Sequence, residues 1–134
     1  MAELIGVPGA SAVVSGGVVA YNTALKHSLL GVDAALLASR GAVDPDVAAA
    51  MADGVRRVCA IGGVPASIGL STTGVAGPDS QDGKPVGTVF VGVSTDAGRH
   101  VFGLTLGGSR NALRRRVVSE SLVQLKKVLT EPDT

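Results

Sequence analysis

Apolar residues recur at helical spacing in two stretches of the chain. The first begins with Asp44-Pro45-Asp46, and a capping side chain, a proline in the first turn and a second acid are typical of a helix start. The second follows Ser109, which is also a capping residue type. We therefore expect a helix from Asp44 to about Cys59 and a long final helix after Ser109. The expected core faces are Val47, Ala50, Met51, Val55 and Val58 in the first helix, and Leu113, Val117, Leu122, Leu125 and Leu129 in the second.

Short apolar runs bounded by turn residues predict four strands. The turn at residues 95–98 predicts that the last two strands form an antiparallel hairpin. In the first run, Gly16 and Gly17 indicate a bulge or a close backbone approach. The expected strands cover residues 12–21, 66–72, 86–94 and 99–106, and short helical segments are expected at residues 2–5, 23–30 and 33–41.

Helices alternate with strands in the first half of the chain, and a hairpin followed by a helix closes the second half. This order predicts an α/β fold, a three-layer α/β/α sandwich around a mixed, largely parallel sheet. The length fits one domain over residues 1–134. In open sheets of this kind, ligands bind at the carboxyl ends of strands. We therefore expect the segments after Tyr21, after Thr72 and at Gly107–Arg110 to gather into a site.

Composition narrows the classes of function. Hydrophobic residues make up 46% of the chain but aromatic residues only 2%, so the core must come from Val, Leu, Ile and Ala. A net charge of +1 provides no basic field for nucleic acid. No run reaches transmembrane length, and the start, MAELIGVPGAS, lacks the pattern of a secretion signal, so no membrane partner is expected. Cys59 is the single cysteine, which fits a reducing cytosol, and we expect it to be a small core residue.

Tyr21 and Lys26 are the first candidates for chemistry. Tyr21 ends the first predicted strand, and Lys26 lies one turn into the helix that follows, among apolar residues. A lysine held against apolar surface loses hydration, which favours its neutral form. A neutral amine can act as a general base towards a hydroxyl nucleophile. The alternative is a lysine whose ammonium group reaches solvent.

The long loop from Thr72 to Gly87 is the second candidate, because it contains little to bury. Its small residues let a ligand approach the backbone, exposed N–H groups form an anion nest, and the hydroxyls of Thr72 and Thr73 add donors. The alternative is an ordinary connection between strands. In either case, the charged residues of the loop, which are Asp79, Asp82 and Lys84, are expected to be solvated turn residues.

The start of the final helix is the third candidate. A helix N-terminus attracts anions, and Arg110 could grip a phosphate or a carboxylate through paired donors. The alternative is a surface arginine. His27 and His100 have no partners at metal-ligand spacing, so no metal site is expected.

Four stretches of the sequence carry a family resemblance. They are VPGASAVVSGGVVAY followed by Lys26, GAVDPDVAAAMADGVR, TTGVAGP with KPVGTV, and GGSR followed by Arg114, and together they span nearly the whole chain. In this order they resemble the CinA C-terminal domain family, the nicotinamide-nucleotide amidohydrolases. The resemblance implies a three-layer α/β/α fold without metal or cofactor. It also implies hydrolysis of nicotinamide mononucleotide to nicotinic acid mononucleotide and ammonia, in cytoplasmic pyridine-nucleotide salvage by a homo-oligomer.

The resemblance assigns roles to particular residues. In that family a serine attacks the amide carbon and a lysine activates it. The lysine matches Lys26, and Tyr21 matches the neighbouring tyrosine of the catalytic site. The residues that would bind the nucleotide are Thr73, Gly74, Ala76 and Gly77 in the loop, and Arg110 and Arg114 in the final helix.

The sequence departs from the family pattern at the nucleophile. The family's serine lies in an E-S-x-T-G-G motif that this sequence does not contain, and Ser11 and Ser15 match non-catalytic positions. We therefore expect the family's first strand and helix to be missing before Met1, which leaves the domain incomplete at its N-terminus. A mis-started gene, partner subunits that cover the gap, or a degenerate domain would each explain this. Two other functions stay open: an inactive nucleotide-binding or interaction module, and a structural subunit that binds nothing small.

Overall fold

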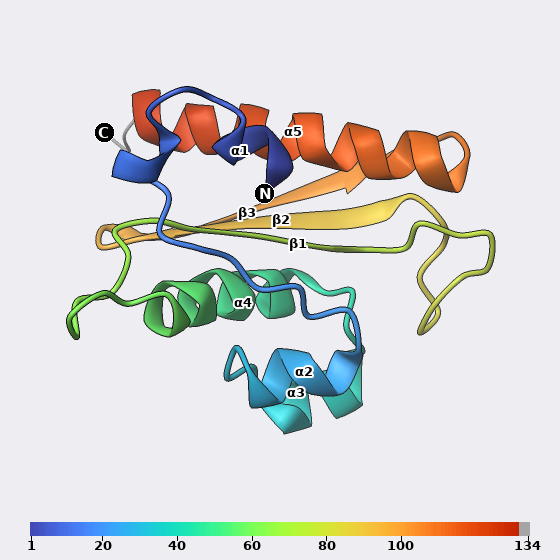
Figure 1. The fold of residues 1–134 in the computed structure, drawn as a ribbon. Helices are drawn as coiled ribbons and strands as arrows, with labels where there is room; N and C mark the ends of the chain where they lie inside the picture. Colours follow the sequence, from blue (N-terminus) through green and yellow to red (C-terminus); the bar gives the residue numbers. More distant parts are fainter. Residues whose placement is uncertain (132–134) are drawn as a thin grey trace.

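The computed structural model describes residues 1–131. Its elements follow one another along the chain as helices, then strands, then a final helix (Figure 1). No helix in this described range is long and apolar enough to cross a membrane. The elements are α1 (Ala2–Ile5), the 3-10 turn η1 (Ala10–Ala12), α2 (Thr23–Ser28), α3 (Ala34–Arg40), α4 (Pro45–Val58), β1 (Gly69–Gly74), β2 (Thr88–Thr95), β3 (Gly98–Thr105) and α5 (Arg110–Thr130).

The sheet lies between two layers of helices (Figure 1). α5 runs along one face of the sheet, and α4 covers the opposite face. α2 and α3 pack beneath α4, where Leu30 and Val32 share a core with Val47 and Met51 of α4. This arrangement confirms the α/β class and the three-layer α/β/α sandwich.

The direction of the strands differs from the prediction. The strand order is β1-β2-β3, and both pairings are antiparallel, with Gly69 opposite Ser94 and Thr88 opposite Thr105. A largely parallel sheet is therefore wrong for the described residues. The predicted hairpin is confirmed. β2 also returns antiparallel to β1, because only a loop and no crossover helix connects the two strands.

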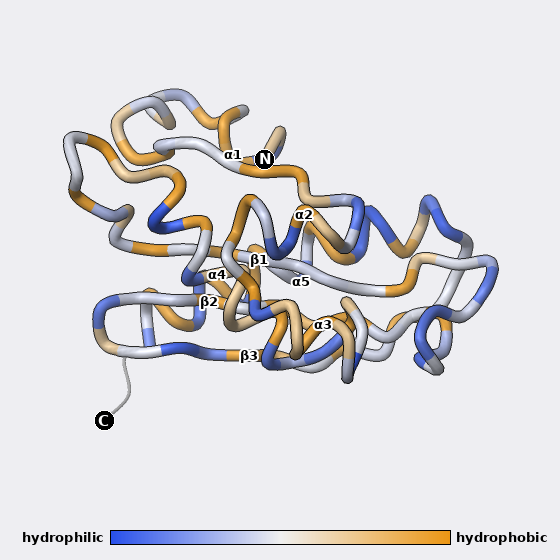
Figure 2. Tube along the Cα trace, turned by 90° about the horizontal axis from the view of Figure 1, so that it is seen from below, coloured by the Kyte–Doolittle hydropathy of each residue, from blue (hydrophilic) through white to orange (hydrophobic). Residues whose placement is uncertain are grey.

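The first predicted strand, residues 12–21, is not part of the sheet. The segment begins in the 3-10 turn η1 and then continues as an extended trace (Figure 1), in which Val18 and Ala20 pack into the core while Val19 and Tyr21 point outward and are 87% and 83% exposed. Within residues 1–131 no neighbouring strand pairs with it. Figures 1 and 2 place α1 on the α5 side of the sheet, and the segment then passes the β1 edge to reach α2 on the α4 side. The strand predicted from this apolar run is therefore wrong, because a sequence pattern cannot supply a pairing partner.

The two long helices begin at the predicted capping residues. Asp44 caps α4 and Ser109 caps α5 through bonds from backbone N–H groups to their side chains. The predicted core face of α5 is only partly right. Leu113 is buried, but Leu129 is 55% exposed, and the polar side chains of Ser121 and Gln124 occupy buried positions. The apolar pattern could not identify polar residues on the inner face.

Small residues let α4 approach the sheet closely. On the face of the sheet that α4 covers, Ser71 donates its hydroxyl to the carbonyl oxygen of Ala48 at 2.6 Å. Next to it, a Cβ at Gly92 would lie 2.4 Å from that same Ala48 oxygen. A Cβ at Gly69 would lie 2.0 Å from the carbonyl oxygen of Ala52 in α4. The glycines in these strands are therefore required by close approach of a helix backbone rather than by turns.

Candidate functional site

A cleft of about 560 Å³ lies between the end of β1 and the first half of α5. It opens where the carboxyl end of β1 continues into the long loop, and the side chain of Tyr21 reaches it from the extended N-terminal segment. The cleft is lined by Tyr21, Thr72, Thr73, Gly74, Val75, Ala76, Val89, Arg110, Asn111, Leu113, Arg114, Arg115, Val117 and Val118. Six of the predicted site residues are therefore gathered around it.

Arg110 connects three parts of the chain at the mouth of the cleft. Its Nη1 donates to the carbonyl oxygen of Gly77 at 2.7 Å, and its Nη2 donates to the hydroxyl oxygen of Tyr21 at 3.2 Å. Ser109 caps the helix directly before Arg110 and fixes where this side chain emerges. The structure thus brings Gly77, which does not itself line the cleft, into contact with a residue that does.

Lys26 does not line the cleft, but it follows Tyr21, which does, by only five residues. Its side chain is buried, with an exposed fraction of 7%, and Nζ donates to the carbonyl oxygen of Ala20 at 3.0 Å. Burial removes water from the ammonium group and lowers the pKa of Lys26 from its ordinary value. Ala20, which accepts this hydrogen bond, directly precedes Tyr21. The bond therefore holds Lys26 against the segment whose tyrosine reaches the cleft.

The two threonines at the end of β1 point in opposite directions. Side chains alternate along a strand, and the hydroxyl of Thr73 donates to the carbonyl oxygen of Ala42 at 2.7 Å, on the side of α4. Thr72 pairs with Val91, which packs in the core beneath α5, so its side chain stands on the face of the cleft. The exposed Thr72 hydroxyl, and not that of Thr73, is the side-chain donor offered to a ligand.

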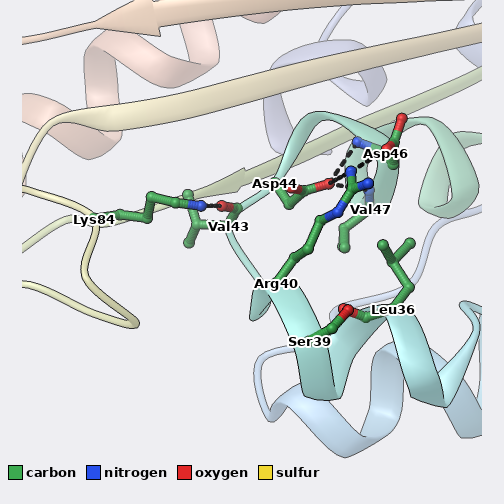
Figure 3. Close-up of polar contacts among 8 residues, drawn as sticks. All are labelled: Leu36, Ser39, Arg40, Val43, Asp44, Asp46, Val47 and Lys84. Carbon is green, nitrogen blue, oxygen red and sulfur yellow. Dashed lines mark hydrogen bonds and ion pairs between the residues drawn. The ribbon is translucent and has the colours of Figure 1, made fainter.

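The long loop is attached to the helices on the α4 side of the sheet. Nζ of Lys84 donates to the carbonyl oxygen of Val43, just before α4, at 2.9 Å (Figure 3). Arg40 and Asp46 form an ion pair in the same region. The expectation that Lys84 is a solvated turn residue is therefore wrong, because its ammonium group satisfies a backbone carbonyl of the neighbouring layer.

Arg114 follows Arg110 by one turn of α5 and lines the same cleft. Within residues 1–131 its guanidinium group has no hydrogen bond or ion pair to a protein group. Asn111 and Arg115, which are not among the predicted site residues, also reach the cleft. Their spacing on the first turns of the helix was a signal that could have identified them.

The remaining candidates do not extend the site. Nδ1 of His27 contacts the carbonyl oxygen of Val32 at 2.7 Å, within the layer of α2. Cys59 is a half-buried free thiol at the end of α4. Among residues 1–131 there is no group of three His, Cys, Asp or Glu side chains arranged to hold a metal ion.

Comparisons with known proteins agree with this fold. The family model described as CinA C-terminal domain matches residues 1–129. A CinA-like protein from Frankia casuarinae is 45% identical over 127 residues, which are 95% of this chain and 28% of that protein. Overall, this chain spans less than a third of the length of the curated relatives it matches.

Two solved structures share the architecture. Competence/damage inducible protein CihA from Agrobacterium tumefaciens superposes with a TM-score of 0.85 at 30% identity, over 95% of this chain and 76% of that one. Competence damage-inducible protein A (ComA) from Klebsiella pneumoniae superposes with a TM-score of 0.88 at 25% identity, over 98% and 80% of the two chains. The similarity thus covers both helical layers and the sheet that separates them.

Proposed function

The chain belongs to the CinA C-terminal domain family, and on this premise we propose that it serves as a nicotinamide-nucleotide amidohydrolase. The reaction removes ammonia from nicotinamide mononucleotide and leaves nicotinic acid mononucleotide, a step of cytoplasmic pyridine-nucleotide salvage. The roles of the residues follow the family resemblance described above. Homo-oligomer formation is part of the same proposal.

The observation that carries the proposal is the cleft between β1 and α5. It gathers Tyr21, the small residues at the start of the loop and two arginines around one space of about 560 Å³. This volume lies within the range of small-molecule sites. The ligand is anionic through its phosphate, and Arg110 and Arg114 give this end of the cleft positive charge. The exposed hydroxyl of Thr72 adds a neutral donor.

Lys26 supplies the base. A hydroxyl group attacks the carboxamide carbon and its proton passes to a neutral amine; the C–N bond then breaks, and the same proton leaves with ammonia. Water afterwards hydrolyses the acyl intermediate and releases the carboxylate. Burial lowers the pKa of Lys26 and so increases its neutral fraction.

We assign the attacking hydroxyl to no residue of this chain. The E-S-x-T-G-G motif is not in the sequence. Ser11 and Ser15 are exposed, and neither has a hydrogen bond to Lys26 in the described part of the chain.

A second function is favoured by the same observation together with the position of Lys26. Its amine donates to the carbonyl oxygen of Ala20 and does not line the cleft. A chain in this state would bind a pyridine nucleotide through the loop and the arginines without cleaving it. This second candidate is a nucleotide-binding module.

Ammonia release distinguishes the two candidates. We would join to Met1 a segment of a family relative that carries E-S-x-T-G-G, and assay release of ammonia from nicotinamide mononucleotide. The amidohydrolase proposal predicts turnover that is abolished by Lys26→Met, while nucleotide binding stays nearly unchanged. In the same assay the 134-residue chain alone should be inactive.

Each other result excludes a specific part of the account. A joined chain that binds the nucleotide but releases no ammonia would leave the binding module as the function. Turnover by the 134-residue chain would mean that one of its own hydroxyl groups attacks. Full turnover in the Lys26→Met variant would remove Lys26 from the mechanism.

A further inference from the structure

Arg110 already uses both of its terminal nitrogens within the protein. One donates to Gly77 and the other to Tyr21. A bidentate grip on a phosphate needs two neighbouring N–H groups of the guanidinium fork in one direction. The two protein acceptors therefore leave only three of the five N–H groups of Arg110 for a phosphate.

Of these two acceptors, the carbonyl oxygen of Gly77 has the greater need of a hydrogen-bond donor from the protein. Gly77 is buried and has a positive φ of +87°, and a Cβ at this position would lie 2.8 Å from Cγ1 of Val86. The loop thus folds back on itself at Gly77, and a buried carbonyl in such a turn requires a donor. Arg110 is the donor found for it in the described structure.

The other contact leads towards the buried lysine. Tyr21 follows Ala20, whose carbonyl oxygen accepts the hydrogen bond from Nζ of Lys26. By holding the Tyr21 hydroxyl, Arg110 ties the end of the extended segment to α5 across 89 residues of sequence. A single guanidinium group thereby connects the loop, the anchor of Lys26 and the final helix.

Arg114 differs from Arg110 in one decisive respect. It lines the same cleft one turn further along α5, and in the described residues its donors have no protein acceptor. All five N–H groups are then available to an oxyanion ligand. The two arginines carry the same charge and line the same cleft from α5, but only Arg110 is hydrogen-bonded to other protein groups in the described residues.

We propose that Arg110 is a positioning residue, which fixes Gly77 and Tyr21 at the mouth of the cleft, and that Arg114 binds the anionic group of the ligand. This inference rests on the proposed function insofar as the ligand is a nucleotide with a phosphate group. It divides between the two arginines a role that the family resemblance assigns to both.

Hydrogen exchange in the ligand-free protein tests the role of Arg110. The amides of Val75 and Gly87 close the base of the loop, through bonds to Thr88 and Val75. We expect Arg110→Met to speed their exchange by about tenfold, because the loop opens more often without its brace. Arg114→Met is the matched control and should leave both rates unchanged. Tyr21→Phe should speed exchange less than Arg110→Met, and should add nothing in the Arg110→Met background.

Ligand selectivity tests the role of Arg114. Nicotinamide mononucleotide and nicotinamide riboside differ by the phosphate, so the ratio of their affinities reports on its binding. We expect Arg114→Met to lower this ratio by about tenfold or more, the loss typical of charge-assisted hydrogen bonds. Arg110→Met should weaken both ligands to a similar extent and leave the ratio unchanged, which a residue that binds the phosphate would not do.

Two results would overturn the inference. One is unchanged exchange at Val75 and Gly87 in Arg110→Met. The other is a fall of the affinity ratio in Arg110→Met together with a constant ratio in Arg114→Met. If the unmodified protein binds neither ligand, the proposed function fails and the role of Arg114 fails with it. The exchange rates then decide the role of Arg110 by themselves.

Discussion

At the scale of single residues, Lys26, Lys84 and Arg110 each donate to an acceptor in another segment of the chain. The apolar neighbours of Lys26 left two alternatives open, a buried amine or an ammonium group that reaches solvent, and the structure shows the buried one. The bond between Arg110 and Tyr21 was not foreseeable, because 89 residues separate the partners and no local pattern encodes such a contact. Lys84 was misjudged for the same reason, since its acceptor, Val43, belongs to another layer.

The lowered pKa of Lys26 makes stability depend on pH in a defined direction. Burial favours the neutral amine, so the folded protein releases this proton at lower pH than the unfolded chain, whose value is near 10.5. Between these two pKa values the unfolded chain binds more protons, and the free energy of unfolding must rise with pH. At pH values below both, the cost of burying the charge is present in full.

Denaturant unfolding at a series of pH values below 10.5 measures this contribution. We expect the free energy of unfolding of the wild type to rise with pH relative to that of Lys26→Met, which keeps the apolar stem and lacks the charge. Parallel pH profiles of the two proteins would show that Lys26 does not titrate abnormally.

At the scale of elements, boundaries and caps were predictable where local chemistry determines them. Asp44 and Ser109 begin the long helices as expected. The relative direction of the paired strands was not predictable. Alternation of helices and strands indicates parallel pairing only if crossover helices connect the strands. The buried Gln124 was also missed, and its Oε1 has no hydrogen-bond partner in the described part of the chain.

Close packing of α4 on the sheet leads to a prediction for Gly92. An added Cβ would meet the carbonyl oxygen of Ala48 at 2.4 Å, and neither backbone can move without loosening the layer. We expect Gly92→Ala to lower the free energy of unfolding by about 1–3 kcal/mol, as overpacking does in other cores. Gly103→Ala is the control, because on the same face of the sheet its Cβ would make only an ordinary contact with Phe90, at 3.4 Å. Equal losses in the two variants would contradict this account of the packing.

At the scale of the whole molecule, the long loop connects the two helical layers across the end of the sheet. Lys84 attaches it to the segment before α4 (Figure 3), and Arg110 attaches it to α5. The sequence singled out this loop because it has few apolar side chains to bury. In the structure, polar contacts to the neighbouring layers hold it in place. The loop is held on one side by its own Lys84 and on the other by Arg110 of α5, and its first residues form a wall of the cleft.

Calorimetric titration of the 134-residue chain with nicotinamide mononucleotide tests most directly whether the cleft binds a nucleotide. We expect saturable binding at one site per chain, weakened when the riboside replaces the nucleotide. A titration without binding heat at several temperatures, from a chain shown to be folded, would contradict the assignment of the cleft as a nucleotide site.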